Sequence, residues 1–194
     1  YTLSRGLGDV YKRQARNGLE FNRHWDNMEK ILEKCPRVNL TIMSTYNALS
    51  VPNYHKLVEG VYGLKEKYGS SDRYWNSAVF LDSSYLRFPS HQTVQVLPNK
   101  WTKNIFEQAQ LADYLAVPLF ENRFIGYSDI EVQKIKRIWD WRMATWEQKE
   151  EQVKQQRYNF GKFFKEHDKR RGTDFCKTFP ELADFYNDCL EIKL

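Results

Sequence analysis

Apolar and polar residues alternate along residues 38–45, and this alternation predicts a strand. The apolar residues at every second position are Val38, Leu40 and Ile42. β-Branched residues are dense in the same run, which favours an extended conformation. The chain then changes character, because Asn47 is typical of a turn, Ser50 of a helix N-cap and Pro52 of a first helical turn. Residues 38–50 are therefore predicted to form a strand that runs into a turn and a helix.

Helical periodicity flanks this strand on both sides. The apolar face before it consists of Phe21, Trp25, Met28, Leu32 and Cys35. The apolar face after it consists of Tyr54, Leu57, Val58, Val61 and Leu64. A second apolar strand follows at 78–82, and the helix between the strands is long enough for a crossover and too long for a hairpin. We therefore expect 38–45 and 78–82 to be parallel neighbours, with helices 19–35 and 52–68 on the same face of the sheet. Both strands are expected to be buried on both faces, as is typical of parallel sheets.

The polar turn at residues 44–50 is the first candidate site, since ligands of parallel sheets bind at the carboxyl ends of strands. Asp82 closes the second predicted strand. Its carboxylate is either a site residue or a simple turn carboxylate. Ser44, Asn47 and Asp82 should lie along one sheet edge, and Arg16, which precedes a returning helix, should reach the same edge.

Helical patterns dominate after residue 98, which follows a short extended segment expected at 93–97. The apolar face of the first of these helices consists of Trp101, Ile105, Ala109, Ala112 and Leu115. Ser128 and Glu131 form a capping-box signature at the start of the longest predicted helix, roughly 129–157. The many charges in its second half indicate a solvated face. A last helix is expected near 180–190.

Composition is that of an ordinary globular protein, with 41% hydrophobic and 28% charged residues. The net charge of +5 is mildly basic and does not by itself indicate nucleic-acid binding. No apolar run has the length of a transmembrane helix, and no signal-peptide core is visible. Three scattered cysteines fit a reducing compartment, so a cytoplasmic location is predicted. The cysteines and the four histidines show no metal-ligand spacing, and no metal site is expected within this chain.

The first fourteen residues, YTLSRGLGDVYKRQ, show no periodicity and resemble translated adapter sequence. Gly6 and Gly8 lack the third glycine and the preceding strand of a phosphate-binding loop. We expect residues 1–14 to be a non-native or disordered tail whose deletion leaves the melting temperature unchanged. The native part would then begin inside a longer protein.

The sequence after Gln14 resembles the C-terminal half of radical S-adenosylmethionine enzymes with a twitch-type C-terminal extension. The stretches that carry the resemblance are ARNGLEFNRHWDNMEKIL, VNLTIMSTYNALSVP, VFLDSSYLRFPSHQTVQVLP and, near the end, FFKEHDKRRGTDFCKTFPE. The resemblance implies an α/β fold. Residues 15–98 would be the C-terminal half of a partial (β/α)6 TIM-like barrel with parallel strands, and residues 99–194 a mostly helical extension.

The resemblance also implies an activity. Such enzymes cleave S-adenosylmethionine reductively at a [4Fe-4S] cluster, and the resulting 5′-deoxyadenosyl radical abstracts hydrogen from a substrate. The CxxxCxxC loop that ligates the cluster does not occur in this sequence, so its ligands are expected upstream and the fragment alone is expected to be inactive. Cys176 and Cys189 are too few for an auxiliary cluster. This chain would supply cofactor-side and substrate-side contacts, and no catalytic residue is identified.

Cofactor-binding residues follow from the same resemblance. Arg16 and Asn17 lie where a loop would contact the ribose and the methionine carboxylate, although a surface arginine at a helix start is an equal alternative for Arg16. The strand end that would hold the adenine corresponds to Ser44, Thr45 and Asn47. The loop that would close over the adenine corresponds either to residues 86–89 or to residues 96–98, which include Leu97.

A basic helical interaction or nucleic-acid-binding module without enzymatic activity is the alternative function. The positive charge, a Trp-rich helix and the basic residues 169–171 favour it. The surrounding run 167–174 is either a solvated loop or an arginine fork for a carboxylate or phosphate. For the enzyme, the expected partners are an unknown substrate, either a peptide or a small molecule, and a reductant such as flavodoxin or ferredoxin. Neither a membrane nor a nucleic acid is expected as a partner.

Overall fold

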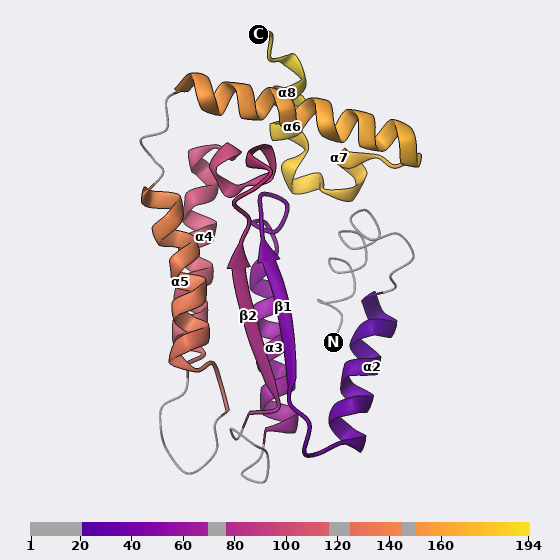
Figure 1. Ribbon diagram of the computed structural model, residues 1–194, viewed down its shortest axis with the longest axis vertical. Helices are drawn as coiled ribbons and strands as arrows, with labels where there is room; N and C mark the ends of the chain where they lie inside the picture. The colour runs from indigo at the N-terminus through magenta and orange to yellow at the C-terminus, as the bar shows by residue number, and fades with distance from the viewer. Residues whose placement is uncertain (1–20, 70–76, 117–124, 145–149) are drawn as a thin grey trace.

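The computed structural model describes residues 21–69, 77–116, 125–144 and 150–194 (Figure 1). The elements in chain order are α2 (Phe21–Lys34), β1 (Leu40–Tyr46), α3 (Tyr54–Tyr68), β2 (Val79–Tyr85), the 3-10 turns η2 (Ser90–Gln92), η3 (Val94–Val96) and η4 (Asn99–Trp101), then α4 (Thr102–Tyr114), α5 (Asp129–Ala144), α6 (Glu150–Arg171), α7 (Phe175–Thr178), η5 (Pro180–Leu182) and α8 (Ala183–Glu191).

Strands β1 and β2 are parallel neighbours, which confirms the pairing predicted from the length of the intervening helix. Their register runs from Leu40 opposite Val79 to Tyr46 opposite Tyr85. Helix α3 is the crossover between them. It begins at Tyr54 with Asn53 at the N-cap position, three residues after Ser50, the N-cap that the sequence predicted. Helix α2 packs beside α3, where Trp25 comes so close to Gly60 that an added Cβ would lie 3.2 Å from its ring.

The prediction of a partial (β/α)6 TIM-like barrel is wrong. The described residues form one two-stranded parallel sheet, and helices account for most of the rest, so the fold is a mostly helical α/β arrangement. Among the described residues, no further strand joins the sheet after β2. Pro89 and Pro98 bracket the next segment, and proline cannot donate to a sheet ladder. The segment 93–97, which was expected to be extended, contains the 3-10 turn η3, and only Thr93 and Leu97 at its ends have extended backbone.

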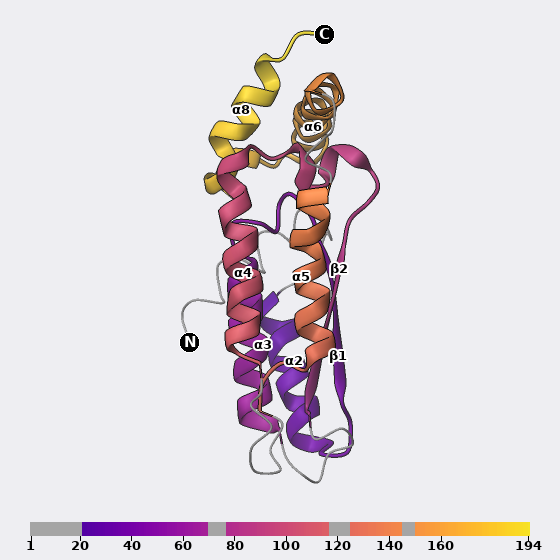
Figure 2. The ribbon, with the colours of Figure 1, turned by 90° about the vertical axis from the view of Figure 1, so that its left-hand side faces the viewer.

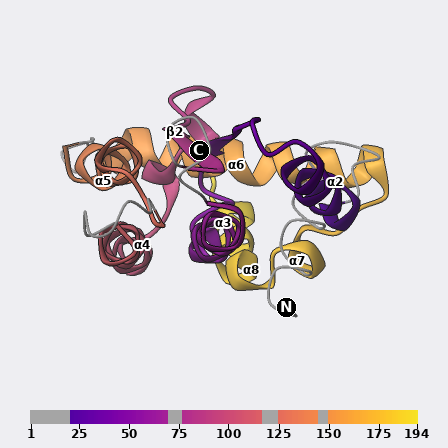
Figure 3. The ribbon, with the colours of Figure 1, turned by 90° about the horizontal axis from the view of Figure 1, so that it is seen from below.

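The two faces of the strand pair have different surroundings. Helices α3 and α4 lie on one side of the sheet, and no described helix lies on the other (Figures 2 and 3). On the helical side, the β2 side chains are buried, among them Val79 and Leu81 at 0% exposure. On the opposite side, Met43 is 82% exposed, and Thr41 and Thr45 are exposed too. We call this second side the open face. A strand buried on both faces, as the sequence predicted for β1, is therefore not what the described residues form.

The longest predicted helix, 129–157, is divided between two helices that run in different directions. Helix α5 ends at Ala144, α6 begins at Glu150, and α6 lies across the carboxyl ends of the strands (Figure 1). An aromatic cluster holds α6 to α7 and α8, with Phe160 5.7 Å from Phe175 and 5.1 Å from Phe185 between ring centroids. The backbones of α6 and α8 also approach closely, since a Cβ on Gly161 would lie 3.0 Å from the carbonyl of Cys189.

Candidate functional site

The turn at the carboxyl end of β1 is ordered by Asn47. Its Oδ1 accepts a hydrogen bond from the Leu49 N–H at 2.9 Å, and its Nδ2 donates to the Thr45 carbonyl at 3.3 Å. The Ala48 N–H donates to the Gln92 carbonyl at 2.9 Å, which ties this turn to η2. Asn47 is buried, so its side chain shapes the turn from inside, as expected of an asparagine that hydrogen-bonds its own backbone.

Ser44 and Thr45 point to opposite sides of the sheet, because successive strand residues alternate. Ser44 lies on the helical side, on the same side as Tyr54, whose pKa it helps to lower. Tyr54 in turn shares a 2.5 Å hydrogen bond with Ser83. Burial is the main reason that the pKa of Tyr54 is raised, so this hydroxyl stays protonated. Thr45, by contrast, is exposed on the open face.

Leu97 lies close to the strand ends, with its side chain inside the core at 1% exposure. Only its backbone is engaged in polar contacts: its carbonyl accepts from Arg142 Nη2 at 3.0 Å. The same guanidinium donates from Nη1 to the carbonyls of Val94 and Gln95 at 3.1 and 3.2 Å. Arg157 of α6 donates from Nε to the Val96 carbonyl at 2.7 Å. Two arginines therefore hold the η3 turn between them.

Sequence reasoning missed this role of the two arginines. Burial, and secondarily the positive charge of Arg157, lowers the pKa of Arg142. Arg142 follows Ile135 and Ile138 at helical spacing on the buried face of α5, and an arginine in that place is a signal that could have been used. Its loop partners lie 45 to 48 residues away in sequence, which no local pattern indicates.

Asp82 does not end its strand. It lies in the middle of β2, opposite Met43 on the open face, and its Oδ1 is 2.7 Å from Lys134 Nζ. The same ammonium lies 5.3 Å from the centre of the Phe80 ring. The predicted line of Ser44, Asn47 and Asp82 along one strand end is thus not formed, because β2 continues to Tyr85.

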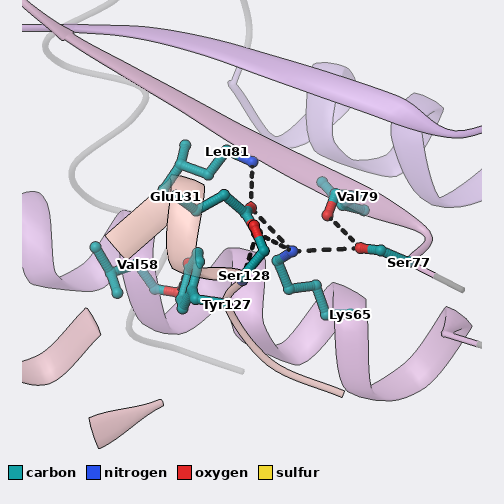
Figure 4. A network of polar contacts seen from close by, with 8 residues as sticks. All are labelled: Val58, Lys65, Ser77, Val79, Leu81, Tyr127, Ser128 and Glu131. Atoms are coloured by element: carbon teal, nitrogen blue, oxygen red, sulfur yellow. Dashed lines mark hydrogen bonds and ion pairs between the residues drawn. The ribbon is translucent and has the colours of Figure 1, made fainter. Parts of the chain in front are cut away.

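A second polar group lies at the opposite, amino end of the strands (Figure 4). Glu131 of α5 lies 2.9 Å from Lys65 Nζ of α3, and both side chains are 1% exposed. The Glu131 carboxylate also accepts from the Leu81 N–H at 2.7 Å, and from the N–H and hydroxyl of Ser128 at 2.9 and 2.8 Å. Burial lowers the pKa of Lys65, and the Glu131 charge opposes that shift. Every contact here joins core elements, so this group is structural.

Cys176 and Cys189 are poor candidates for cluster ligands. A ligand thiol must lose its proton, whereas burial raises the pKa of Cys189 to about 12 and also raises that of Cys176. Among the described residues, no three His, Cys, Asp or Glu side chains are grouped so as to hold a metal ion. Arg16 and Asn17 lie outside the described residues, as does the predicted tail.

The chain matches no protein-family model, no curated protein and no solved structure. No helix in the described ranges is both long and apolar enough to cross a membrane.

Proposed function

We propose that this chain is part of a radical S-adenosylmethionine enzyme, in which the carboxyl end of β1 contacts the adenosine of the cofactor. The observation that carries the proposal is the parallel pairing of β1 with β2, which leaves Thr45 exposed on the open face beside an ordered polar turn. The sequence resemblance predicted a contact at this same turn. The position also follows the general rule that parallel sheets bind ligands beyond the carboxyl ends of their strands.

The residues at this end can hold an adenosine. The Thr45 hydroxyl is available to a ribose or an adenine edge, since it is exposed on the open face. Asn47 acts as a positioning residue, because its amide fixes the Thr45 carbonyl. Ser44 supports the site from the helical side, whereas the Leu97 carbonyl and N–H are already engaged by Arg142 and by the Val94 carbonyl.

A [4Fe-4S] cluster does not fit this chain. Cys35, Cys176 and Cys189 lack the spacing of a three-thiolate loop, and the last two have raised pKa values. The cluster would be held by residues outside this sequence. There it would supply the one-electron reduction that gives such enzymes their radical chemistry. Within this chain, the task is to bind and orient the cofactor and the substrate.

The test is binding of S-adenosylhomocysteine, which has the adenosine of the cofactor without its reactive sulfonium. The full chain, labelled with ¹⁵N, would be titrated and the amide shifts followed. We expect shifts at Thr45 to Ser50 and a loss of affinity of about 3- to 10-fold in Thr45→Val, the usual effect of one hydrogen bond. Thr41→Val is the matched control, since Thr41 is an exposed threonine of the same face near the amino end of β1.

Two results would overturn the proposal. One is an absence of saturable shifts at the 45–50 turn. The other is an equal loss of affinity in Thr41→Val and Thr45→Val, which would place the nucleoside elsewhere on the open face.

A further inference from the structure

The two outer edges of the sheet differ in how their backbone groups are satisfied. In a parallel pair, the backbone groups of alternate residues point to the partner strand, and those of the residues between them point outward. The Leu40 N–H donates to the Ala78 carbonyl, and the Tyr46 carbonyl accepts from the Leu86 N–H. Even-numbered residues of the two strands therefore pair with each other, and odd-numbered residues direct their N–H and C=O groups to the outer edges.

The outer edge of β2 is closed by side chains (Figure 4). The Leu81 N–H donates to Glu131 at 2.7 Å, and the Val79 carbonyl accepts from the Ser77 hydroxyl at 2.8 Å. Helix α5 also packs against this strand. A strand added on this side would have to displace both contacts and the helix.

The outer edge of β1 carries backbone groups that have no hydrogen-bond partner among the described residues. These are the N–H and C=O groups of Thr41 and Met43 and the N–H of Thr45, whereas the Thr45 carbonyl accepts from Asn47. Natural edge strands are protected by charged residues, proline or a bulge. The sequence of β1, LTIMSTY, contains neither a charge nor a proline, and its register with β2 is continuous. This edge therefore lacks the protection that an unpaired edge strand needs.

We propose that the outer edge of β1 binds an extended segment of another polypeptide, which pairs with it as a third strand of the sheet. Backbone N–H and C=O groups that recur along a strand edge are complementary to an extended peptide, because such a peptide repeats the same groups at the same spacing. The interaction uses the length of β1 and is independent of nucleoside binding at the turn that follows it.

The side chains beside this edge define the chemistry of the bound segment. On the open face, Thr41 and Thr45 are exposed, and Met43 between them is 82% exposed. Asp82, the charged residue of β2, is already paired with Lys134. Cross-strand pairs of threonines and of β-branched with apolar residues stabilise a sheet. We therefore expect an uncharged segment that places threonine, valine or isoleucine on the open face.

A second copy of this chain is the less favoured occupant of the edge. Pairing of β1 with its own copy would be antiparallel, about a two-fold axis perpendicular to the sheet. Helix α2 lies beside β1 on the side away from β2 (Figures 1 and 3). The axis would bring the α2 of the second copy to the β2 side of the first β1, where α3 already packs. A single extended segment needs only about 4.8 Å beside β1 and avoids this overlap.

The experiment titrates the ¹⁵N-labelled full chain with a peptide that alternates threonine and valine over about the length of β1, with a lysine at each end for solubility. Backbone pairing should protect the outward amides of Thr41, Met43 and Thr45 from hydrogen exchange by about tenfold or more at saturation. The inward amides of Ile42 and Ser44, which already pair with β2, should change much less. A peptide of the same sequence that is methylated on every backbone nitrogen is the matched control, and it should not bind.

A pair of variants at one position tests the same contact from the side of the chain. Met43→Pro removes an outward donor without removing a hydrogen bond to β2, and proline is tolerated in an edge strand at such a position. It should weaken peptide binding by about tenfold or more, whereas Met43→Ala should weaken it by less than about threefold. Circular dichroism and the melting temperature check that both variants fold. The methylated peptide tests the proposal on the unaltered chain if Met43→Pro does not fold.

Several results would overturn the proposal. Two of them are an absence of saturable peptide binding and equal binding of the methylated peptide. A third is binding that leaves the three outward amides unprotected, which would place the peptide elsewhere on the molecule. A fourth is protection of these amides without peptide that increases with protein concentration, which would assign the edge to a second copy of the chain.

Discussion

Helix α5 buries a charged side chain near each of its ends, and the two are held by different kinds of partner. Near the amino end, Glu131 meets the Lys65 ammonium, the Leu81 N–H and Ser128, so one carboxylate joins α3, β2 and the start of α5. Near the carboxyl end, Arg142 donates to carbonyls of the η3 segment and to the side chains of Asn99 and Thr102. Each charge has the sign that the helix dipole favours at its end.

The contacts of Glu131 and those of Arg142 should therefore affect different properties, the first the stability of the whole fold and the second the order of one loop. The contacts at the amino end connect helices and a strand that form the core, so their loss should destabilise the whole fold. The carboxyl-end contacts hold a loop of 3-10 turns, which makes few backbone hydrogen bonds of its own. The candidate nucleoside site depends on that loop, since Gln92 fixes the turn after β1. Lys134 lies between Glu131 and Arg142 on α5, and its side chain pairs with Asp82 on the open face. This ion pair is a third contact of the same helix with which the other two can be compared.

The largest effect is expected from Glu131→Leu. This substitution leaves the Lys65 ammonium buried without its counter-charge and should cost about 3–5 kcal/mol of unfolding free energy. Adding Lys65→Met should restore part of the loss, because both charges are then gone. Urea unfolding measures both values. A double variant no more stable than Glu131→Leu would show that the pair does not act as a unit.

A smaller and more local effect is expected from Arg142→Met. The carbonyls of Val94, Gln95 and Leu97 lose a donor, at a cost of about 1–3 kcal/mol. Hydrogen exchange should accelerate across 90–101 and remain slow in α3. Arg137→Met, which alters an exposed arginine of the same helix, is the control. Uniform acceleration throughout the core would contradict the assignment of this arginine to the loop.

Lys134→Met should change stability by less than about 1 kcal/mol, because the ion pair with Asp82 is partly solvated. The two side chains are 28% and 32% exposed. Thermal unfolding at low and high salt checks this. Asp82→Asn should change stability by a similarly small amount, because it removes the same ion pair. A loss comparable to that of Arg142→Met would mean that the open face is less accessible than its exposure indicates.

The smallest expected effect is the pH dependence contributed by His91. Burial lowers the pKa of His91, and its Nε2 is buried without a hydrogen-bond partner among the described residues. The unfolded chain therefore binds a proton more readily, and stability falls as the pH drops below the ordinary histidine pKa of about 6.5. His91→Phe should lose less stability than the wild type on this acid side, as melting temperatures across the range would show. Parallel pH profiles for the two proteins would refute this role.

The sequence alone determined the local order of the core. The length and periodicity of residues 52–68 were enough to predict a crossover helix and parallel strands, because a hairpin cannot contain such a helix. The Ser128 and Glu131 spacing identified the start of α5, since capping is a contact between residues three apart. Asn47 was placed in a turn for a similarly local reason.

Tertiary structure decided which of these residues face the candidate site. Alternation along β1 does not say which side the helices cover, so the partial burial of Ser44 on the helical side and the exposure of Thr45 came from packing. Glu131 has a second role that its capping spacing did not reveal, because Lys65 is 66 residues distant. The prediction of a barrel was wrong for a related reason. A strand forms only where another strand supplies its hydrogen bonds, and a local sequence pattern cannot show whether that partner strand is present.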